Sequence, residues 1–211
     1  MKQQLTIHLD LSSLSGFLSM QPTLDLVEEL QIPAQWLPVS GILARLSSKQ
    51  PNQTSDDPLA AYKARRAKAR FQFEQREHHR NCQRLGITEE QGLRHFDAEQ
   101  VHVGLLYVNQ LGIDPRDYIT GVYRAGFAQE KTLQTPDEVA ELLQGLGISG
   151  AGFLDYQKTG KLELSALQQQ LLEQSIFDSP AYLYQGERYH GRQHLPLLRW
   201  TIEGSKGDPP V

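Results

Sequence analysis

A proline stands directly in front of a predicted hairpin near the end of the chain. Pro180 precedes the short apolar run 181–184, and Gln185-Gly186 separates that run from a second short predicted strand, 187–190. Glycine adopts positive φ freely, so this pair predicts a two-residue hairpin turn. Proline lacks an N–H, which makes the start of a strand one of the few places in a sheet that tolerate it. Because most X-Pro bonds are trans, the local sequence alone favours a trans bond at Pro180.

The cysteine count limits the chemistry. Cys82 is the single cysteine of the 211 residues, so the chain can form neither an intramolecular disulfide nor a Cys-x-x-Cys motif. A thiol–disulfide oxidoreductase normally needs an attacking and a resolving thiol. His78, His79 and Cys82 lie close in sequence, but a zinc site needs three or four ligands and the sequence offers no second cluster. We therefore predict no dithiol chemistry and no metal.

Composition and charge describe an ordinary soluble protein. The net charge is −4 and hydrophobic residues make up 39% of the chain. No run approaches the roughly 18 apolar residues of a membrane span. The first residues carry no apolar signal region and lead straight into a strand pattern, so we expect a cytoplasmic protein without membrane contact.

Hydrophobic periodicity divides the chain into a β start, a helical middle and a β end. Residues 5–11 alternate as a strand does, and residues 34–39 are predicted to form a short second strand. Helical patterns and start signals such as Asp114-Pro115 and Thr135-Pro136 predict a series of helices. Their expected ranges are 17–30, 59–85, 96–111, 114–128, 135–146, 151–157, 162–175 and 193–200.

Both ends of the chain resemble one known group of proteins. The first strand ends in Asp10 and is followed by x-x-Ser13, and the last part combines Ser179-Pro180, a glycine turn, an aromatic-x-Gly (Tyr189 to Gly191) and a closing helix. This pattern resembles thioredoxin-like proteins related to the bacterial disulfide oxidoreductases. More narrowly, it is similar to the 2-hydroxychromene-2-carboxylate isomerases and the kappa-class glutathione transferases.

The resemblance implies a fold. We expect an α/β protein with a thioredoxin-like core, residues 1–50 and 173–204, and a large all-helical insertion, residues 51–172. Residues 205–211 form a tail without core residues, which we expect to be disordered. In the resembling family the proline before the hairpin is cis and faces the active site, so the resemblance predicts a cis Ser179-Pro180 bond.

The resemblance also implies a glutathione-dependent isomerase or transferase that acts on a small electrophilic or aromatic substrate. Ser13 corresponds to the serine that faces the ligand sulfur, at the place of the attacking cysteine of the disulfide oxidoreductases. Ser179 and Pro180 would bind the ligand backbone, and Asn52 would reach it from a loop. Where the family has Gly-x-Asp-Arg, this chain has Gly191-Arg192-Gln193-His194, so Arg192 and Gln193 become ligand-binding candidates.

Several alternatives stay open. Serine is also a common helix N-cap, so Ser13 has a purely structural interpretation. A non-catalytic binding protein that retains the fold is the alternative function. Residues 63–84 carry eight basic side chains against two acidic ones, which suits either a solvated helix face or a nucleic-acid contact, and the second is the weakest interpretation. His190 and His194 lie near the predicted site, and a homodimer is among the partners considered.

Overall fold

The computed structural model describes residues 3–40, 58–86, 97–128, 131–176 and 179–210. The chain divides into two compact units. One consists of residues 1–41 and 95–211, and the other of residues 42–94. The predicted boundaries at residues 50, 172 and 204 stay a prediction.

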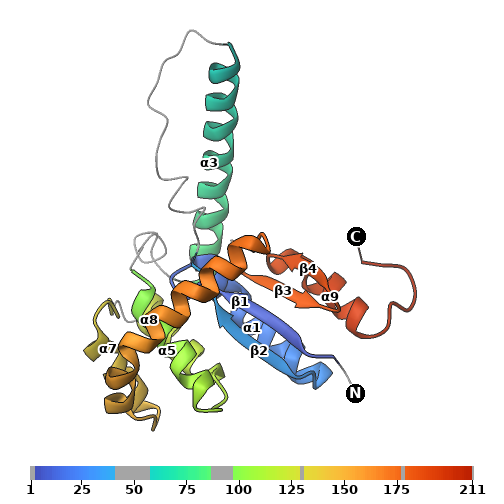
Figure 1. Cartoon of the computed structure of the whole chain (residues 1–211). Coiled ribbons are helices and arrows are strands. Elements are labelled where there is room, and N and C mark those ends of the chain that lie inside the picture. The colour runs from blue at the N-terminus through green and yellow to red at the C-terminus, as the bar shows by residue number, and fades with distance from the viewer. Residues whose placement is uncertain (1–2, 41–57, 87–96, 129–130, 177–178, 211) are drawn as a thin grey trace. The chain divides into compact units, whose positions relative to one another are not determined.

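The first unit is built on a sheet, which has four strands in the described residues. They are β1 (Leu5–Leu9), β2 (Ala34–Pro38), β3 (Ala181–Tyr184) and β4 (Glu187–His190), in the order β2-β1-β3-β4. Strand β1 pairs parallel with β2 and antiparallel with β3, and β3 pairs antiparallel with β4 (Figure 1). The N-terminal βαβ half and the C-terminal hairpin therefore meet at the β1–β3 pair, which brings Asp10 beside Ser179.

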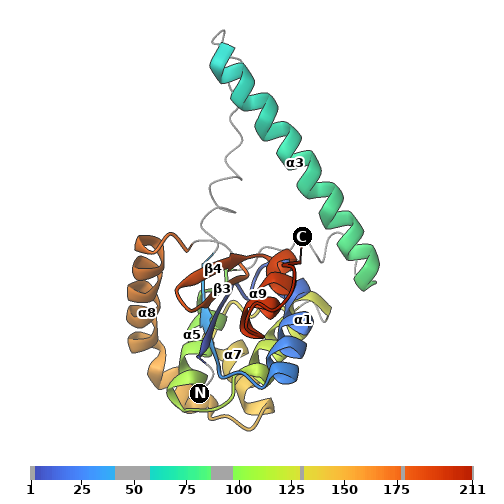
Figure 2. The same cartoon turned by 90° about the vertical axis from the view of Figure 1, so that its right-hand side faces the viewer.

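Helices cover both faces of the sheet (Figure 2). Helix α1 (Leu14–Leu30) lies against α9 (Leu195–Ile202), and the hydroxyls of Thr23 and Tyr182 are hydrogen bonded at 2.8 Å. The opposite face is covered by α5 (Glu99–Gln110) and α8 (Gly150–Glu173). The side-chain amide of Asn109 in α5 donates to the Trp36 carbonyl at 2.8 Å, which fixes α5 against β2.

The helical middle of the chain continues with α6 (Arg116–Tyr123), which runs directly into a π-helix over Arg124–Ala128, and with α7 (Pro136–Gly145). A capping box formed by Thr135 and Glu138 begins α7, as the Thr-Pro-Asp-Glu pattern predicts. Helix α3 (Pro58–Leu85) belongs to the second unit. Among the described helices, none combines the length and apolar character that crossing a bilayer requires.

One helix prediction is wrong. The sequence predicts two helices, 151–157 and 162–175, but residues 150–173 form the single helix α8. Its mid-helix glycine, Gly160, has a packing reason. A Cβ at Gly160 would lie 2.6 Å from both a methyl carbon of Val103 and the ring of Tyr156. The glycine allows α8 to approach α5 closely, so it marks tight packing instead of a helix end.

The predicted hairpin is confirmed. Gln185 and Gly186 have φ of 54° and 81°, the positive values that a two-residue turn of this kind needs at both positions. The Ser179–Pro180 bond is cis. The expectation from the resemblance is therefore confirmed, and the trans bond favoured by the local sequence is wrong.

Candidate functional site

Ser13 begins helix α1. Its backbone is extended (φ −94°, ψ 137°), and its Oγ accepts a hydrogen bond from the Gly16 N–H at 3.0 Å. The same hydroxyl donates to the Asp10 carbonyl at 2.9 Å. Ser13 is therefore an N-cap, as its structural interpretation predicts. Its only proton points at a backbone carbonyl, so a ligand would have to compete for it.

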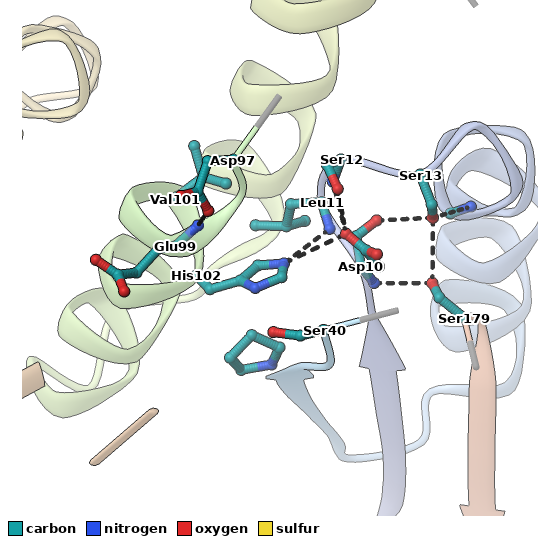
Figure 3. Close-up of polar contacts among 12 residues, drawn as sticks. Asp10, Leu11, Ser12, Ser13, Ser40, Asp97, Glu99, Val101, His102 and Ser179 are labelled. Atoms are coloured by element: carbon teal, nitrogen blue, oxygen red, sulfur yellow. Dashed lines mark hydrogen bonds and ion pairs between the residues drawn. The ribbon is translucent and has the colours of Figure 1, made fainter. Parts of the chain in front are cut away.

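The cis proline segment lies beside this serine. Ser179 Oγ accepts from the Asp10 N–H at 2.8 Å and lies 3.5 Å from Ser13 Oγ (Figure 3). The exposed Ser15 hydroxyl donates to the Ser179 carbonyl at 2.8 Å. Strand pairing thus brings the predicted residues Ser13, Ser179 and Pro180 together, and Ser15 joins them from the first turn of α1.

Of the remaining predicted site residues, the structure describes Arg192 and Gln193 but not Asn52, which lies outside the described residues. Arg192 and Gln193 are exposed in the short 3-10 turn Arg192–His194, which contacts α1. This turn follows Gly191, whose N–H donates to the Pro180 carbonyl at 2.8 Å. Arg192 and Gln193 are therefore held next to the cis proline, while their binding role stays a prediction.

The histidines near the site have structural contacts. His194 Nδ1 bonds to the carbonyl of His190, which fixes the turn to the end of β4. Among the described residues, no group of three or more His, Cys, Asp or Glu side chains lies close enough to hold a metal ion. Cys82 is buried in α3.

A buried acid–base pair lies behind the serines, and sequence reasoning misses it. The Asp10 carboxylate accepts from the backbone N–H and the hydroxyl of Ser12, at 2.9 and 2.7 Å. His102, on α5 and 1% exposed, brings Nε2 to 3.6 Å from Asp10 Oδ1, as Figure 3 shows. A histidine inside an apolar helical pattern is the one signal in the sequence, and it does not reveal the partner.

The contacts of this pair govern the ionisation of Asp10. The Leu11 N–H donates to His102 Nε2 at 3.1 Å. The other ring nitrogen, Nδ1, is buried without a hydrogen-bond partner among the described residues. Burial opposes ionisation of Asp10, but the hydrogen bond and charge of His102 and the two bonds from Ser12 outweigh it and lower the pKa of Asp10.

Solved structures share this fold. The chain is similar to a 2-hydroxychromene-2-carboxylate isomerase, with a TM-score of 0.68 and 15% identity over 95% of both chains. It is also similar to a probable DsbA oxidoreductase from Streptomyces coelicolor (TM-score 0.63, 13% identity, 99% of this chain and 93% of that one). A third is the cytosolic disulfide reductase DsbM from Pseudomonas aeruginosa with GSH (TM-score 0.58, 10% identity, 96% and 98%).

No protein-family model matches the chain, and neither does any curated protein. At these identities the structural matches establish the fold. The predicted class is confirmed: an α/β protein with a DsbA-like thioredoxin fold and a helical insertion.

Proposed function

We propose that this protein is a glutathione-dependent isomerase or transferase that acts on a small electrophilic or aromatic substrate. The observation that carries the proposal is the meeting of Ser13, at the N-terminus of a 17-residue helix, with the Ser179-Pro180 segment. Two structural neighbours, an isomerase and a reductase described with GSH, support the same class of chemistry. A cytoplasmic location and a homodimer belong to the proposal as well.

The residues present fit a thiol-bearing peptide. The Ser179 carbonyl accepts one hydrogen bond from Ser15. A carbonyl oxygen has a second lone pair, which can accept from a ligand N–H. The hydroxyls of Ser13 and Ser15 and the N-terminus of α1 all favour a nearby anion. These groups suit a peptide whose thiol is ionised beside Ser13.

In the proposed reaction, this chain binds glutathione and polarises its thiol. Bound glutathione supplies a thiolate nucleophile, which the chain does not carry at this place because Ser13 stands where a cysteine would be needed. Ser13 turns its proton from the Asp10 carbonyl toward the sulfur and so lowers the pKa of the thiol. Ser179 and Pro180 fix the peptide backbone, and Arg192 binds a carboxylate of the ligand.

Ser13→Ala separates catalytic from structural roles. Loss of the N-cap should cost about 1 kcal/mol of unfolding free energy. Loss of a hydrogen bond to a charged sulfur should also raise the pKa of bound glutathione by about 1–2 units. Calorimetric titration measures binding, and thiolate absorbance against pH measures the pKa.

The matched control is Ser149→Ala. Ser149 caps α8 by accepting from the Gly152 N–H at 3.1 Å. Ser149→Ala should lower the unfolding free energy by about as much as Ser13→Ala does and leave the thiol pKa unchanged. If both variants leave the thiol pKa unchanged, Ser13 is a cap only. If the parent protein binds no glutathione, the enzyme proposal fails and the alternative of a non-catalytic binding protein takes its place.

Dithiol activity should be absent although the fold is shared with disulfide oxidoreductases. The only cysteine, Cys82, is buried in α3, and position 13 is a serine. We expect no insulin reduction above the rate of the buffer in the presence of dithiothreitol. Turnover that persists in Cys82→Ala would contradict this prediction, because that variant has no thiol at all.

A further inference from the structure

The carbonyl oxygen of Asp10 is a meeting point of hydrogen-bond donors. It accepts from the Ser13 N–H at 3.1 Å, from the Ser13 hydroxyl at 2.9 Å and from the Tyr123 hydroxyl at 3.1 Å. A carbonyl has two lone pairs, so the three donors compete. When the Ser13 hydroxyl leaves, the other two donors still satisfy the carbonyl. The Ser13 proton is therefore the one that can be released at low cost.

Tyr123 is a fixed donor. Its side chain is fully buried at the end of α6, where the π-helix begins. Its ring centre lies 5.7 Å from that of Phe17 on α1, and Phe127 of the π-helix stacks on the same Phe17 ring at 5.0 Å. Burial is the largest of the causes that raise the pKa of Tyr123 well above its ordinary value, and the charges of Asp10 and Tyr182 add to it. The phenol therefore keeps its proton at any working pH.

Gly16 leaves room for the Tyr123 hydroxyl. A Cβ built on Gly16 would lie 2.3 Å from Tyr123 Oη and 2.7 Å from the Asp10 carbonyl oxygen. The missing side chain is the space through which Tyr123 reaches the Asp10 carbonyl. Single turns of π-helix occur often at functional sites, and here one follows directly on the residue that enters the serine loop.

We propose that Tyr123 is a positioning residue of this site, whose hydroxyl occupies the Asp10 carbonyl so that Ser13 can turn its proton toward an ionised sulfur beside it. This inference rests on the proposed thiol-binding function. Without the Tyr123 hydroxyl, the Asp10 carbonyl holds the Ser13 proton more strongly and repels a nearby anion more strongly. Both effects have the same sign, and both raise the pKa of a thiol at this place.

The first test needs no ligand. In a Cys82→Ala background, Ser13→Cys places a thiol at the position of the serine oxygen, and thiolate absorbance against pH gives its pKa. Adding Tyr123→Phe should raise that pKa by about one unit. The matched control is Tyr118→Phe, because Tyr118 is also fully buried and also donates to a backbone carbonyl, that of Val101 at 2.9 Å.

Tyr118→Phe should destabilise the protein as Tyr123→Phe does and leave the thiol pKa where it was. Equal pKa values in the two tyrosine variants would overturn the role of Tyr123, since a merely structural effect is common to both. Thermal melting of each variant, recorded beside the titration, shows that the measured proteins are folded.

The second test uses glutathione and the natural Ser13. Tyr123→Phe should raise the pKa of the bound thiol by about one unit, and Tyr118→Phe should not. A parent protein that binds no glutathione refutes the proposed function. An unmoved pKa of the thiol introduced by Ser13→Cys refutes the effect of Tyr123 on a nearby anion, whether or not glutathione binds. An unmoved pKa of bound glutathione in Tyr123→Phe refutes its effect through the Ser13 proton.

Discussion

Acidification from neutral pH to about pH 4 is expected to cost the folded protein about 3 kcal/mol through one residue, His8. His8 lies on β1, between β2 and β3, and is 2% exposed. Burial lowers its pKa from 6.5 to about 4, and its Nδ1 has no hydrogen-bond partner among the described residues. The folded protein therefore keeps His8 neutral where an unfolded chain protonates it.

The sign follows from proton binding. Between pH 6.5 and about 4 the unfolded chain binds a proton that the folded chain does not. The unfolding free energy is therefore undiminished above pH 6.5 and falls by about 1.4 kcal/mol per unit as the pH decreases through this window. Below about pH 4 both states are protonated and His8 adds no further loss. Asp10, whose pKa is lowered below 3.8, acts in a more acidic range.

Urea unfolding of the parent protein and of His8→Leu, at several pH values across this window, measures the effect. The variant should lose most of the pH dependence, because leucine does not titrate and leaves no polar atom unsatisfied. The control variant is His79→Gln, which removes an exposed histidine and leaves His8 in place. An unchanged slope in His8→Leu would show that other groups cause the acid sensitivity.

The parts of the site that can be predicted from sequence are those set by local chemistry. Ser13 before a helix, the Gln185-Gly186 turn and the strand patterns each depend on neighbours in the chain, and all three are predictable for that reason. The cis bond at Ser179-Pro180 requires the family resemblance as well, because the local sequence favours trans. The same resemblance predicts that Ser13 and Ser179 share one site, although 165 residues separate them in the chain.

The parts that cannot be predicted depend on contacts between distant segments. His102 meets Asp10, and Tyr123 meets the Asp10 carbonyl, from helices more than 90 residues along the chain. A buried histidine or tyrosine looks in sequence like any other member of an apolar pattern. The close approach at Gly160 in α8 is of the same kind, since it depends on Val103, which lies on another helix.

Gly16→Ala is expected to lower the unfolding free energy by about 2–3 kcal/mol, at the upper end of what one added methyl group costs in a packed interior. The new Cβ would lie 2.3 Å from Tyr123 Oη, 2.7 Å from the Asp10 carbonyl oxygen and 2.9 Å from Ser13 Oγ. The Asp10 carbonyl is backbone at the end of a central strand and cannot move aside easily. Relief therefore has to come from Tyr123 and Ser13, which disrupts the hydrogen bonds of the site together with its packing.

Gly121→Ala is the matched control for Gly16→Ala. Gly121 is also helical, but its added Cβ would meet only Leu142 and Leu146, at 3.4 and 3.7 Å. Alanine there should be neutral or stabilise the helix by up to about 1 kcal/mol, because glycine is the poorer helix former. The difference between the two variants in urea unfolding isolates the close approach at Gly16. Equal stability of the two variants would contradict the expected effect of the close approach at Gly16. It would mean that Tyr123 moves away from the new Cβ without loss of unfolding free energy. Gly16→Ala, still fully folded, should then raise the thiol pKa as Tyr123→Phe does.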